Sequence, residues 1–296
     1  EYQYCRAIGK SSKEPILAVK HLSTEKFAGG ILAVCNNVAR FSDNVGLVSF
    51  LGERDSQEEF VRQSVDDKVD MTFLYRKDSP TIVKRRFIES YFFTKMIEVY
   101  EMNDGVLDNN DNDLLCATLN EQVDNFDVVI VVDFGNGMLS EKAIKVLTDQ
   151  ARFLAVNAQS NAGNLGYHTI SRYPRADFIS MSEGELRLEA RDRAGNLENM
   201  IADVSRKLSC DKIVVTKGSG GNVCYSVDEG FFEVPAFAGQ VVDRMGAGDA
   251  SFSLTALCVA QNVPMEVVGF IGNTAGAMAV ATVGHREALE RVPLFR

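Results

Sequence analysis

The second half of the chain alternates between short apolar runs and longer stretches with helical spacing. Continuous apolar runs of this length are typical of strands covered on both faces, and we expect them at residues 128–132, 153–156, 178–181 and 213–215. Helices are expected at residues 140–150, 183–208, 248–261 and 263–283. Strand and helix in alternation predict a mostly parallel sheet with helices on both faces.

The first hundred residues combine two kinds of pattern. Gly29-Gly30 opens an apolar stretch that predicts a buried helix over residues 31–41. Residues 46–51 form a short apolar run of strand type, ended by Gly52.

A small β-sheet is expected beside this α/β body. From residue 69 to 100 apolar and polar positions alternate, which is typical of strands with one polar face. An acidic, turn-rich stretch at residues 101–113 follows. We expect the small sheet to form a lid, made of segments 1–28 and 69–102, within a single domain spanning residues 1–296.

Composition narrows the class of protein. The chain has 296 residues, of which 46% are hydrophobic and 24% charged, as expected for a soluble globular protein with a sizeable core. The formal charge of −10 argues against nucleic acid as a partner, because phosphate binding needs basic patches. No apolar run reaches the roughly 18 residues of a membrane span, and the first six residues do not resemble a signal peptide.

The cysteines favour a reducing compartment. The six cysteines form no C-x-x-C pair, and several lie in apolar stretches. Buried free thiols are therefore expected rather than a metal site or disulfides. A cytoplasmic location follows as the expected setting.

The segment 241–252 carries the strongest chemical signal. A strand-like run ends in Gly246-Ala247-Gly248-Asp249, and an apolar helix begins at once. Small residues allow close backbone approach, and the first amides of a helix have no internal partner, so this segment can bind an anion. Asp249 could accept the proton of an attacking hydroxyl in phosphoryl transfer. An Asp that caps a helix after a glycine turn explains the segment equally well.

A second candidate follows the strand at residues 213–215. Thr216, Gly218 and Gly221 would offer a hydroxyl and free amides at the carboxyl edge of a parallel sheet, where ligands usually bind. A glycine hairpin leading to residues 222–225 is an equally good explanation. The segment is neither a P-loop nor a dinucleotide fingerprint.

Together these segments resemble the ribokinase-like (PfkB) family of carbohydrate kinases. The late signature of that family, D-T-x-G-A-G-D, is matched by Asp243 to Asp249 with Arg244 in place of Thr. Four further matches occur in the family's order along the chain: Gly29-Gly30 with Asn37; Asp133 to Gly137 for D-Y-x-K-G, with Asn136 for Lys; Ser182 to Glu185 for N-x-x-E, with Ser182 for Asn; Thr216-x-Gly218 followed by Asn273 to Ala277.

Within this family the chain most resembles the heptose-7-phosphate kinase domain of ADP-heptose synthase enzymes. Residues 12–20 are similar to that group's S-P-E-A-P-V-P-V-V-K, and residues 81–86 to its P-T-x-x-K-x-R. Lys84 and Arg86 are two positions apart, so a strand puts both on one face, where they could hold a phosphate already on the sugar. A solvated strand face is an equally good explanation of these two cations.

The resemblance implies a fold and a set of roles. The fold would be a three-layer α/β/α sandwich with a mostly parallel sheet and a small β-sheet lid. Asp249 would be the catalytic base. The other roles would fall as follows: the anion hole to Gly246, Ala247 and Gly248; the ATP pocket to Thr216, Gly218, Gly221, Asn273 and Ala277; the sugar side to Gly29, Gly30, Asn37, Lys84 and Arg86; Mg²⁺, through water, to Glu185; and a monovalent cation such as K⁺ to Asp243.

The resemblance also implies partners and further chain. Lids of this family commonly pair between subunits, so a homodimer is expected. Relatives are often fused to a nucleotidyltransferase domain, which makes such a domain a possible fused or separate partner, although no H-x-G-H motif occurs here. Glu1 to Tyr4 resembles the stretch just after the family's first strand, so residues upstream of Glu1 are expected in the native protein.

Several positions depart from the family pattern. Ala33 stands where relatives have a sugar-binding Asn, Arg244 and Met245 replace residues of the cation loop, and Asn157 occupies a place where relatives often carry Asp. The leading hypothesis is an active sugar or sugar-phosphate kinase. One alternative is a nucleoside-type kinase. Another is a non-catalytic sugar- or nucleotide-binding domain of a sugar-nucleotide biosynthesis protein. The departures favour this non-catalytic alternative, and the intact Asp249 opposes it.

Overall fold

The computed structural model describes residues 1–294 and divides into two compact units. The small unit contains Glu1–Ala28, Phe50–Ser64 and Tyr75–Asn103. The large unit contains Gly29–Ser49, Val65–Leu74 and the chain from Asp104 onward. The small unit therefore includes residues 50–64, which the alternating pattern did not assign to the expected lid.

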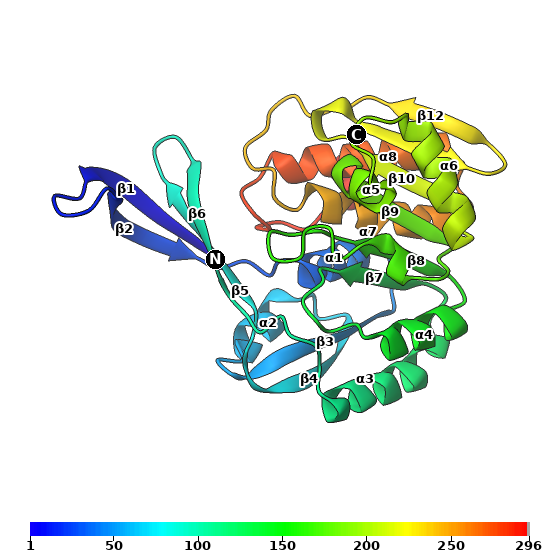
Figure 1. Ribbon diagram of the computed structural model, residues 1–296, viewed down its shortest axis with the longest axis horizontal. Coiled ribbons are helices and arrows are strands. Elements are labelled where there is room, and N and C mark those ends of the chain that lie inside the picture. The colour runs from blue at the N-terminus through cyan, green and yellow to red at the C-terminus, as the bar shows by residue number, and fades with distance from the viewer. Residues whose placement is uncertain (295–296) are drawn as a thin grey trace. The chain divides into compact units, whose positions relative to one another are not determined.

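A six-stranded sheet lies at the centre of the large unit (Figure 1), with the strand order β12-β11-β10-β9-β8-β7. The strands are β7 (Val129–Asp133), β8 (Leu154–Ala158), β9 (Phe178–Ser182), β10 (Lys212–Thr216), β11 (Asn222–Ser226) and β12 (Gly230–Val234). Strands β7 to β10 pair in parallel, and β11 and β12 continue the sheet antiparallel. The mostly parallel sheet predicted from the apolar runs is confirmed.

Strand β10 shows why this sheet needs a layer of helices on each face. Ile213, Val214 and Val215 are all fully buried, and successive side chains of a strand point to opposite faces. Val214 belongs to a core cluster that includes Phe178 and Phe252 and is built with α7 (Ala247–Ala260) and α8 (Met265–Val280). The neighbouring side chains must therefore be covered by the other layer, where α5 (Glu183–Ala190) and α6 (Leu197–Leu208) pack against the sheet. The expected three-layer α/β/α arrangement is confirmed.

Two further helices of the large unit begin at side-chain caps. The predicted helix after residue 140 is α4 (Glu141–Gln150), and the Ser140 side chain accepts a hydrogen bond from the Ala143 N–H. Helix α3 (Asn109–Gln122) begins inside the stretch predicted to be turn-rich, with Asp108 as its cap. The other short elements are α1 (Ile31–Ala39), α9 (Arg291–Leu294) and the 3₁₀ turns Val123–Asn125, Ile170–Arg172 and Gly218–Gly220.

The small unit is built on a four-stranded sheet with the order β2-β1-β5-β6. Its strands are β1 (Tyr2–Lys10), β2 (Leu17–Glu25), β5 (Val83–Glu89) and β6 (Thr94–Glu101). β1 and β5 pair in parallel, and the outer pairs are antiparallel. Strands β3 (Val45–Arg54) and β4 (Val69–Pro80) form a separate two-stranded sheet with residues in both units, and α2 (Glu58–Ser64) belongs to the small unit.

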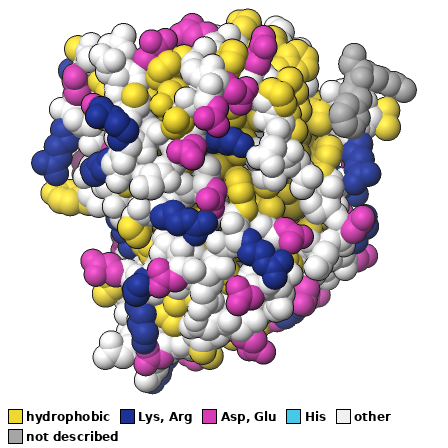
Figure 2. All heavy atoms as spheres, turned by 90° about the vertical axis from the view of Figure 1, so that its right-hand side faces the viewer, with side chains coloured by type: hydrophobic (Ala, Val, Ile, Leu, Met, Phe, Trp, Pro, Cys, Tyr) yellow, Lys and Arg dark blue, Asp and Glu magenta, His cyan; other side chains and the backbone are white. Residues whose placement is uncertain are grey.

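Surface charge, helix length and the cysteines can be compared with the sequence predictions. On the face drawn in Figure 2, Lys and Arg side chains are interspersed with Asp and Glu and form no extended basic patch. Among residues 1–294, no helix is both long enough and apolar enough to cross a bilayer. All six cysteines are free thiols, as predicted, and burial raises the pKa of Cys35, Cys210 and Cys224 to about 12.

Candidate active site

The start of helix α7 has no side-chain cap. The cap is Gly246, which has a φ of 80°, and no side chain caps the helix. The first amides of α7 therefore lack a partner from a cap, and the helix dipole favours an anion there. A Cβ added at Gly248 would meet nothing within 4 Å, so there is room beside the backbone for a bound group. Ala247 is the first residue of the helix.

Asp249 lies in this first turn and is only 9% exposed. Its Oδ1 accepts a hydrogen bond of 2.7 Å from Gln159 Nε2, contributed by the loop after β8. The same nitrogen donates to Asn157 Oδ1, also at 2.7 Å. A buried carboxylate needs such donors, because an unpaired charge is costly to bury.

The glycine pair at the start of α1 lies close to the start of α7. Gly30 caps α1 with a φ of 58°, and a Cβ there would come within 3.0 Å of the Phe134 ring. His285 lies close to both helix starts, since an added Cβ would be 2.3 Å from its Cε1 at Gly246 and 3.5 Å from its Cδ2 at Gly29. The imidazole thus lies between the expected sugar-side turn and the expected anion hole.

Asn37 is not brought to this place. It lies seven residues after Gly30 on α1, about 10 Å further along the helix axis. Its side chain is buried, and its Oδ1 accepts a hydrogen bond from the Leu289 backbone N–H at 2.9 Å. In this structure Asn37 ties the C-terminal segment to α1.

The expected ATP-side residues divide into open and structural positions. Gly218 is exposed, with a φ of 57°, and a Cβ there would meet nothing, whereas a Cβ at Gly221 would lie 2.0 Å from the Val234 carbonyl oxygen. Gly221 is therefore required by the hairpin itself. Asn273 donates from Nδ2 to the carbonyl oxygens of Val234 and Pro235, which fastens α8 to the end of β12. The hairpin explanation therefore applies to Gly221, whereas Gly218 leaves room for a ligand. The remaining two positions, Thr216 at the end of β10 and Ala277 on α8, are half-buried.

Glu185 closes a capping box at the start of α5. Its Oε2 accepts from the Ser182 N–H at 2.8 Å and from the Ser182 hydroxyl at 2.9 Å, and its Oε1 accepts from the Ser160 N–H at 2.9 Å. Both oxygens are engaged, so the carboxylate fits a contact to Mg²⁺ through water better than direct ligation. Among residues 1–294 no three His, Cys, Asp or Glu side chains form a set that could hold a metal ion by themselves.

Asp243 joins the loop that leads into α7 to the loop that follows α8. Its Oδ1 accepts from the Met245 N–H at 3.2 Å, and its Oδ2 accepts from the Gly284 N–H at 3.0 Å. The side chain is 2% exposed. The loop at residues 243–246 is thereby fixed to the loop after α8, which carries His285.

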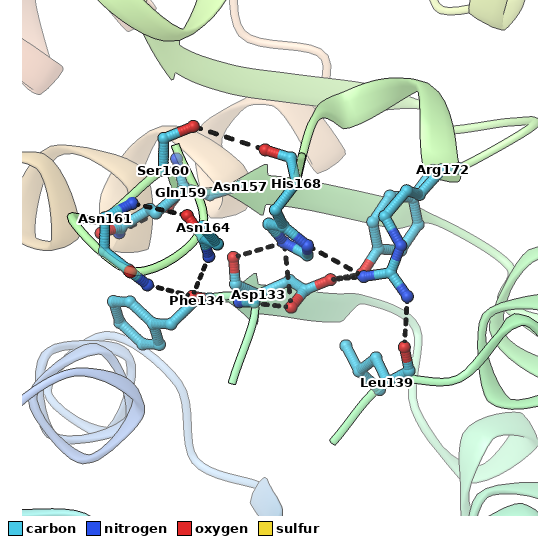
Figure 3. Close-up of polar contacts among 12 residues, drawn as sticks. Asp133, Phe134, Leu139, Asn157, Gln159, Ser160, Asn161, Asn164, His168 and Arg172 are labelled. Carbon is cyan, nitrogen blue, oxygen red and sulfur yellow. Dashed lines mark hydrogen bonds and ion pairs between the residues drawn. The ribbon is translucent and has the colours of Figure 1, made fainter. Parts of the chain in front are cut away.

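A fourth carboxylate, Asp133, ends strand β7 and organises the loop beside the site (Figure 3). It is contacted by Tyr173 Oη at 2.7 Å, Arg172 Nη1 at 3.2 Å and His168 Nε2 at 3.2 Å. Burial by itself would raise the pKa of Asp133, but hydrogen bonds and charge from His168 and the Tyr173 hydroxyl together hold it below the ordinary value. Burial and the neighbouring Asp133 charge raise the pKa of Tyr173.

Lys84 and Arg86 belong to the small unit and share one face of β5, as predicted. They lie opposite Tyr100 and Glu98 on β6. Arg86 forms an ion pair with Glu98, and Lys84 Nζ lies 5.1 Å from the centre of the Tyr100 ring. A phosphate bound here would have to compete with Glu98 for the guanidinium group.

Sequence patterns did not single out Gln159 or His285. Gln159 lies 90 positions from Asp249, and no spacing rule connects an isolated glutamine to a distant carboxylate. Their positions in the sequence were the only signal. Gln159 follows the strand run at 153–156, and His285 follows the helical stretch that ends at Val280.

Solved structures with the same architecture define the class of fold. Phosphofructokinase-2 from Escherichia coli in complex with potassium matches with a TM-score of 0.76 at 15% identity, covering 99% of this chain and 93% of that one. A putative ribokinase II from E. coli, in its apo form, matches with a TM-score of 0.72 at 16% identity, covering 99% and 94%. The fold is therefore ribokinase-like.

The model of the pfkB family carbohydrate kinases matches residues 5–291, and the chain belongs to this family. Curated relatives include the bifunctional protein HldE of Campylobacter jejuni subsp. jejuni serotype O:2, which is 24% identical over 96% of this chain and 59% of its own length. HldE of Bradyrhizobium diazoefficiens is 25% identical over 96% and 58%. The chain thus spans a little under three fifths of these relatives. The predicted family, fold class and enzyme class are confirmed.

Proposed function

We propose that this domain transfers the γ-phosphoryl group of ATP to a hydroxyl of a sugar phosphate, with Asp249 as the base. The observation that carries this proposal is the start of α7, where a glycine cap leaves the helix amides open and a buried carboxylate lies in the same turn. Phosphoryl transfer needs positioning and charge neutralisation more than covalent chemistry, and this turn offers both.

The chain's own residues would act at two places. Asp249 would accept the proton of the attacking hydroxyl as the new oxygen–phosphorus bond forms and the bond to ADP breaks. The amides at Gly246, Ala247 and Gly248 would donate to the transferring phosphoryl oxygens. Mg²⁺ bound to the nucleotide would neutralise phosphate charge, with Glu185 ordering its water. Thr216, Gly218 and Gly221 would border the nucleotide, together with Asn273 and Ala277.

A heptose 7-phosphate or a similar sugar phosphate is the acceptor we propose. The support is the similarity to the HldE proteins and to the P-T-x-x-K-x-R pattern at residues 81–86. Gly29 and Gly30 would border the sugar, and Lys84 and Arg86 would hold its phosphate by displacing Glu98. Because the chain spans only part of those relatives, a nucleotidyltransferase domain, fused or separate, is proposed as its partner.

The kinase assay measures ADP release from Mg-ATP with a panel of sugars and sugar 7-, 6- and 1-phosphates. We expect acceptor-dependent turnover that falls by about 10²–10⁴-fold in Asp249→Asn, because a positioned general base contributes about that much. Turnover that is equal in the wild type and Asp249→Asn would reject the proposal. Tight binding of ATP or sugar with no turnover at all would favour the alternative of a non-catalytic binding domain.

A double variant tests the acceptor class. Lys84→Met with Arg86→Met should raise KM for a sugar phosphate by about tenfold or more, since hydrogen bonds between charged groups are each worth about 1.5–3 kcal/mol. A neutral acceptor should be unaffected. Equal KM changes for both acceptors would favour a nucleoside-type or other neutral substrate.

The small unit also supports the proposal of a homodimer. Apolar side chains are exposed on its strands, among them Ile8 at 68% and Ile97 at 58%. Exposed apolar groups of this kind commonly mark an interface. Sedimentation of the wild type and Ile97→Lys would test the dimer, and a monomeric wild type would reject it.

Potassium activation is proposed only through the Asp243 loop, and a comparison of turnover in K⁺ and in Na⁺ would test it.

A further inference from the structure

A short series of side-chain amides connects Asp249 to the backbone of the central sheet. Asn157, at the end of β8, donates from Nδ2 to the Ser180 carbonyl oxygen of β9 at 2.7 Å. Gln159 donates from one nitrogen to both Asn157 Oδ1 and Asp249 Oδ1, each at 2.7 Å. Figure 3 shows Asn157 and Gln159 beside the loop that carries Asn161 and Asn164.

The direction of these hydrogen bonds is fixed at the sheet. A backbone carbonyl can only accept, so Asn157 must turn its NH₂ group toward Ser180 and its oxygen toward Gln159. Gln159 must then turn its NH₂ group toward Asn157, and its second hydrogen is left for Asp249. An oxygen of Gln159 in that place would face two other oxygens.

The backbone of Gln159 is also held in place. Its N–H donates to the Asp133 carbonyl oxygen at 2.8 Å. Asn157 is 7% exposed and Asp249 is 9% exposed, so the amides act in a place largely shielded from water. Hydrogen bonds in such surroundings are stronger and more directional than at the surface.

We propose that Gln159 is a positioning residue for the catalytic base, holding Asp249 ionised and correctly turned through the amide series that begins at Ser180. The inference rests on the proposed function for its catalytic consequence. An N–H donor stabilises the charged form of a carboxylate, and a fixed Oδ1 limits rotation of the group. Asp249 is thereby prepared to take a proton before the acceptor arrives.

Three substitutions of Gln159 separate donation from packing. Gln159→Met keeps length and volume but removes the donor, and we expect kcat to fall about 10- to 100-fold with KM for ATP within about twofold. The acid limb of the kcat/KM profile should move to higher pH. Gln159→Glu places a second carboxylate opposite Asp249 and should move that limb further. Gln159→Lys keeps N–H donors and should retain kcat within about threefold.

Gln122→Met is the matched control. Gln122 is also half-buried and donates to Thr72 Oγ1 at 2.9 Å, and within residues 1–294 its side chain forms no hydrogen bond with a carboxylate. The Gln122→Met variant should leave kcat and the pH profile unchanged. A purely structural role for Gln159 predicts instead that all three variants lose thermal stability and kcat together without moving the acid limb, and that result would overturn the inference.

A measurement without turnover makes the test independent of the substrate. The ¹³Cγ signal of Asp249, identified by its loss in Asp249→Asn, can be followed against pH in the wild type and in Gln159→Met. A higher titration midpoint in Gln159→Met supports the inference, and identical midpoints reject it. If Asp249→Asn abolishes turnover while Gln159→Met behaves as wild type, this inference fails alone. If Asp249→Asn is fully active, the proposed function fails.

Discussion

The starts of helices α5 and α7 have an acidic residue at the same position but differ in the residue that caps them. Glu185 and Asp249 are each the third residue of their helix. At α5 the cap is Ser182, and the serine and the carboxylate close a box between themselves. At α7 the cap is Gly246, which has no side chain to offer. The cap residue therefore decides whether a helix start is satisfied by its own chain or left for a ligand.

The acidic side chains have different partners as a result. Glu185 receives its hydrogen bonds from its own cap and from Ser160. Asp249 receives a hydrogen bond from Gln159, which lies in the loop after β8 and not in α7. The cap of α5 thus holds one oxygen of Glu185, whereas Gly246 has no side chain with which to hold Asp249. Three substitutions test this comparison.

Gly246→Ala should have the largest effect of the three. An alanine in a left-handed conformation costs about 1–2 kcal/mol, and its Cβ would lie 2.3 Å from His285 Cε1. We expect kcat to fall about tenfold or more, with a melting temperature lower by about 2 °C or more. Adding His285→Ala should recover part of the stability by removing the clash. No recovery would mean that backbone strain alone is responsible.

Gly248→Ala should change stability and activity in opposite directions. Glycine within a helix is less stable than alanine by about 0.5–1 kcal/mol, and a Cβ here would meet no atom within 4 Å. The free protein should therefore melt about 1–3 °C higher. KM for ATP should rise several-fold or kcat fall, because the methyl group would occupy the space beside the open amides. An active, more stable variant would contradict the anion-hole assignment.

Ser182→Ala should have the smallest effect on turnover. It removes the cap of α5, which typically costs about 1 kcal/mol of unfolding free energy. Urea unfolding followed by circular dichroism would measure this loss. The comparison between the two helix starts predicts a higher kcat in Ser182→Ala than in Gly246→Ala. If opening α5 harms turnover as much as obstructing α7, the two helix starts do not differ in the way described.

Local patterns predicted much of the fold. The continuous apolar runs at 128–132 and 213–215 predicted buried strands because a strand between two helical layers needs apolar side chains on both faces. Helix α3 was missed because all five residues from Asn109 to Asp113 are polar, and only its cap, Asp108, gave a signal. The helical stretch predicted at 183–208 is two helices, separated after Arg191 in a left-handed conformation.

The candidate site was predictable only where the chain itself brings residues together. Gly246 and Asp249 share one turn, so their proximity follows from sequence. The contact between Gln159 and Asp249 depends on the order of strands and on the packing of α7, which no local rule supplies. The hydrogen bond that Asn37 accepts from Leu289 was equally out of reach, since it joins positions 252 residues apart; the assignment of Asn37 to the sugar side by resemblance stays a prediction.

The contact of one imidazole with two glycine turns has a practical consequence for spectroscopy. The chain contains three histidines, and His285 lies against Gly29 and Gly246. His21 is in β2 of the small unit, and His168 is buried beside Asp133. The aromatic proton signals of His285 can thus be assigned from a few variants. In an unlabelled sample they would report whether the proposed nucleotide or sugar binds near these two turns.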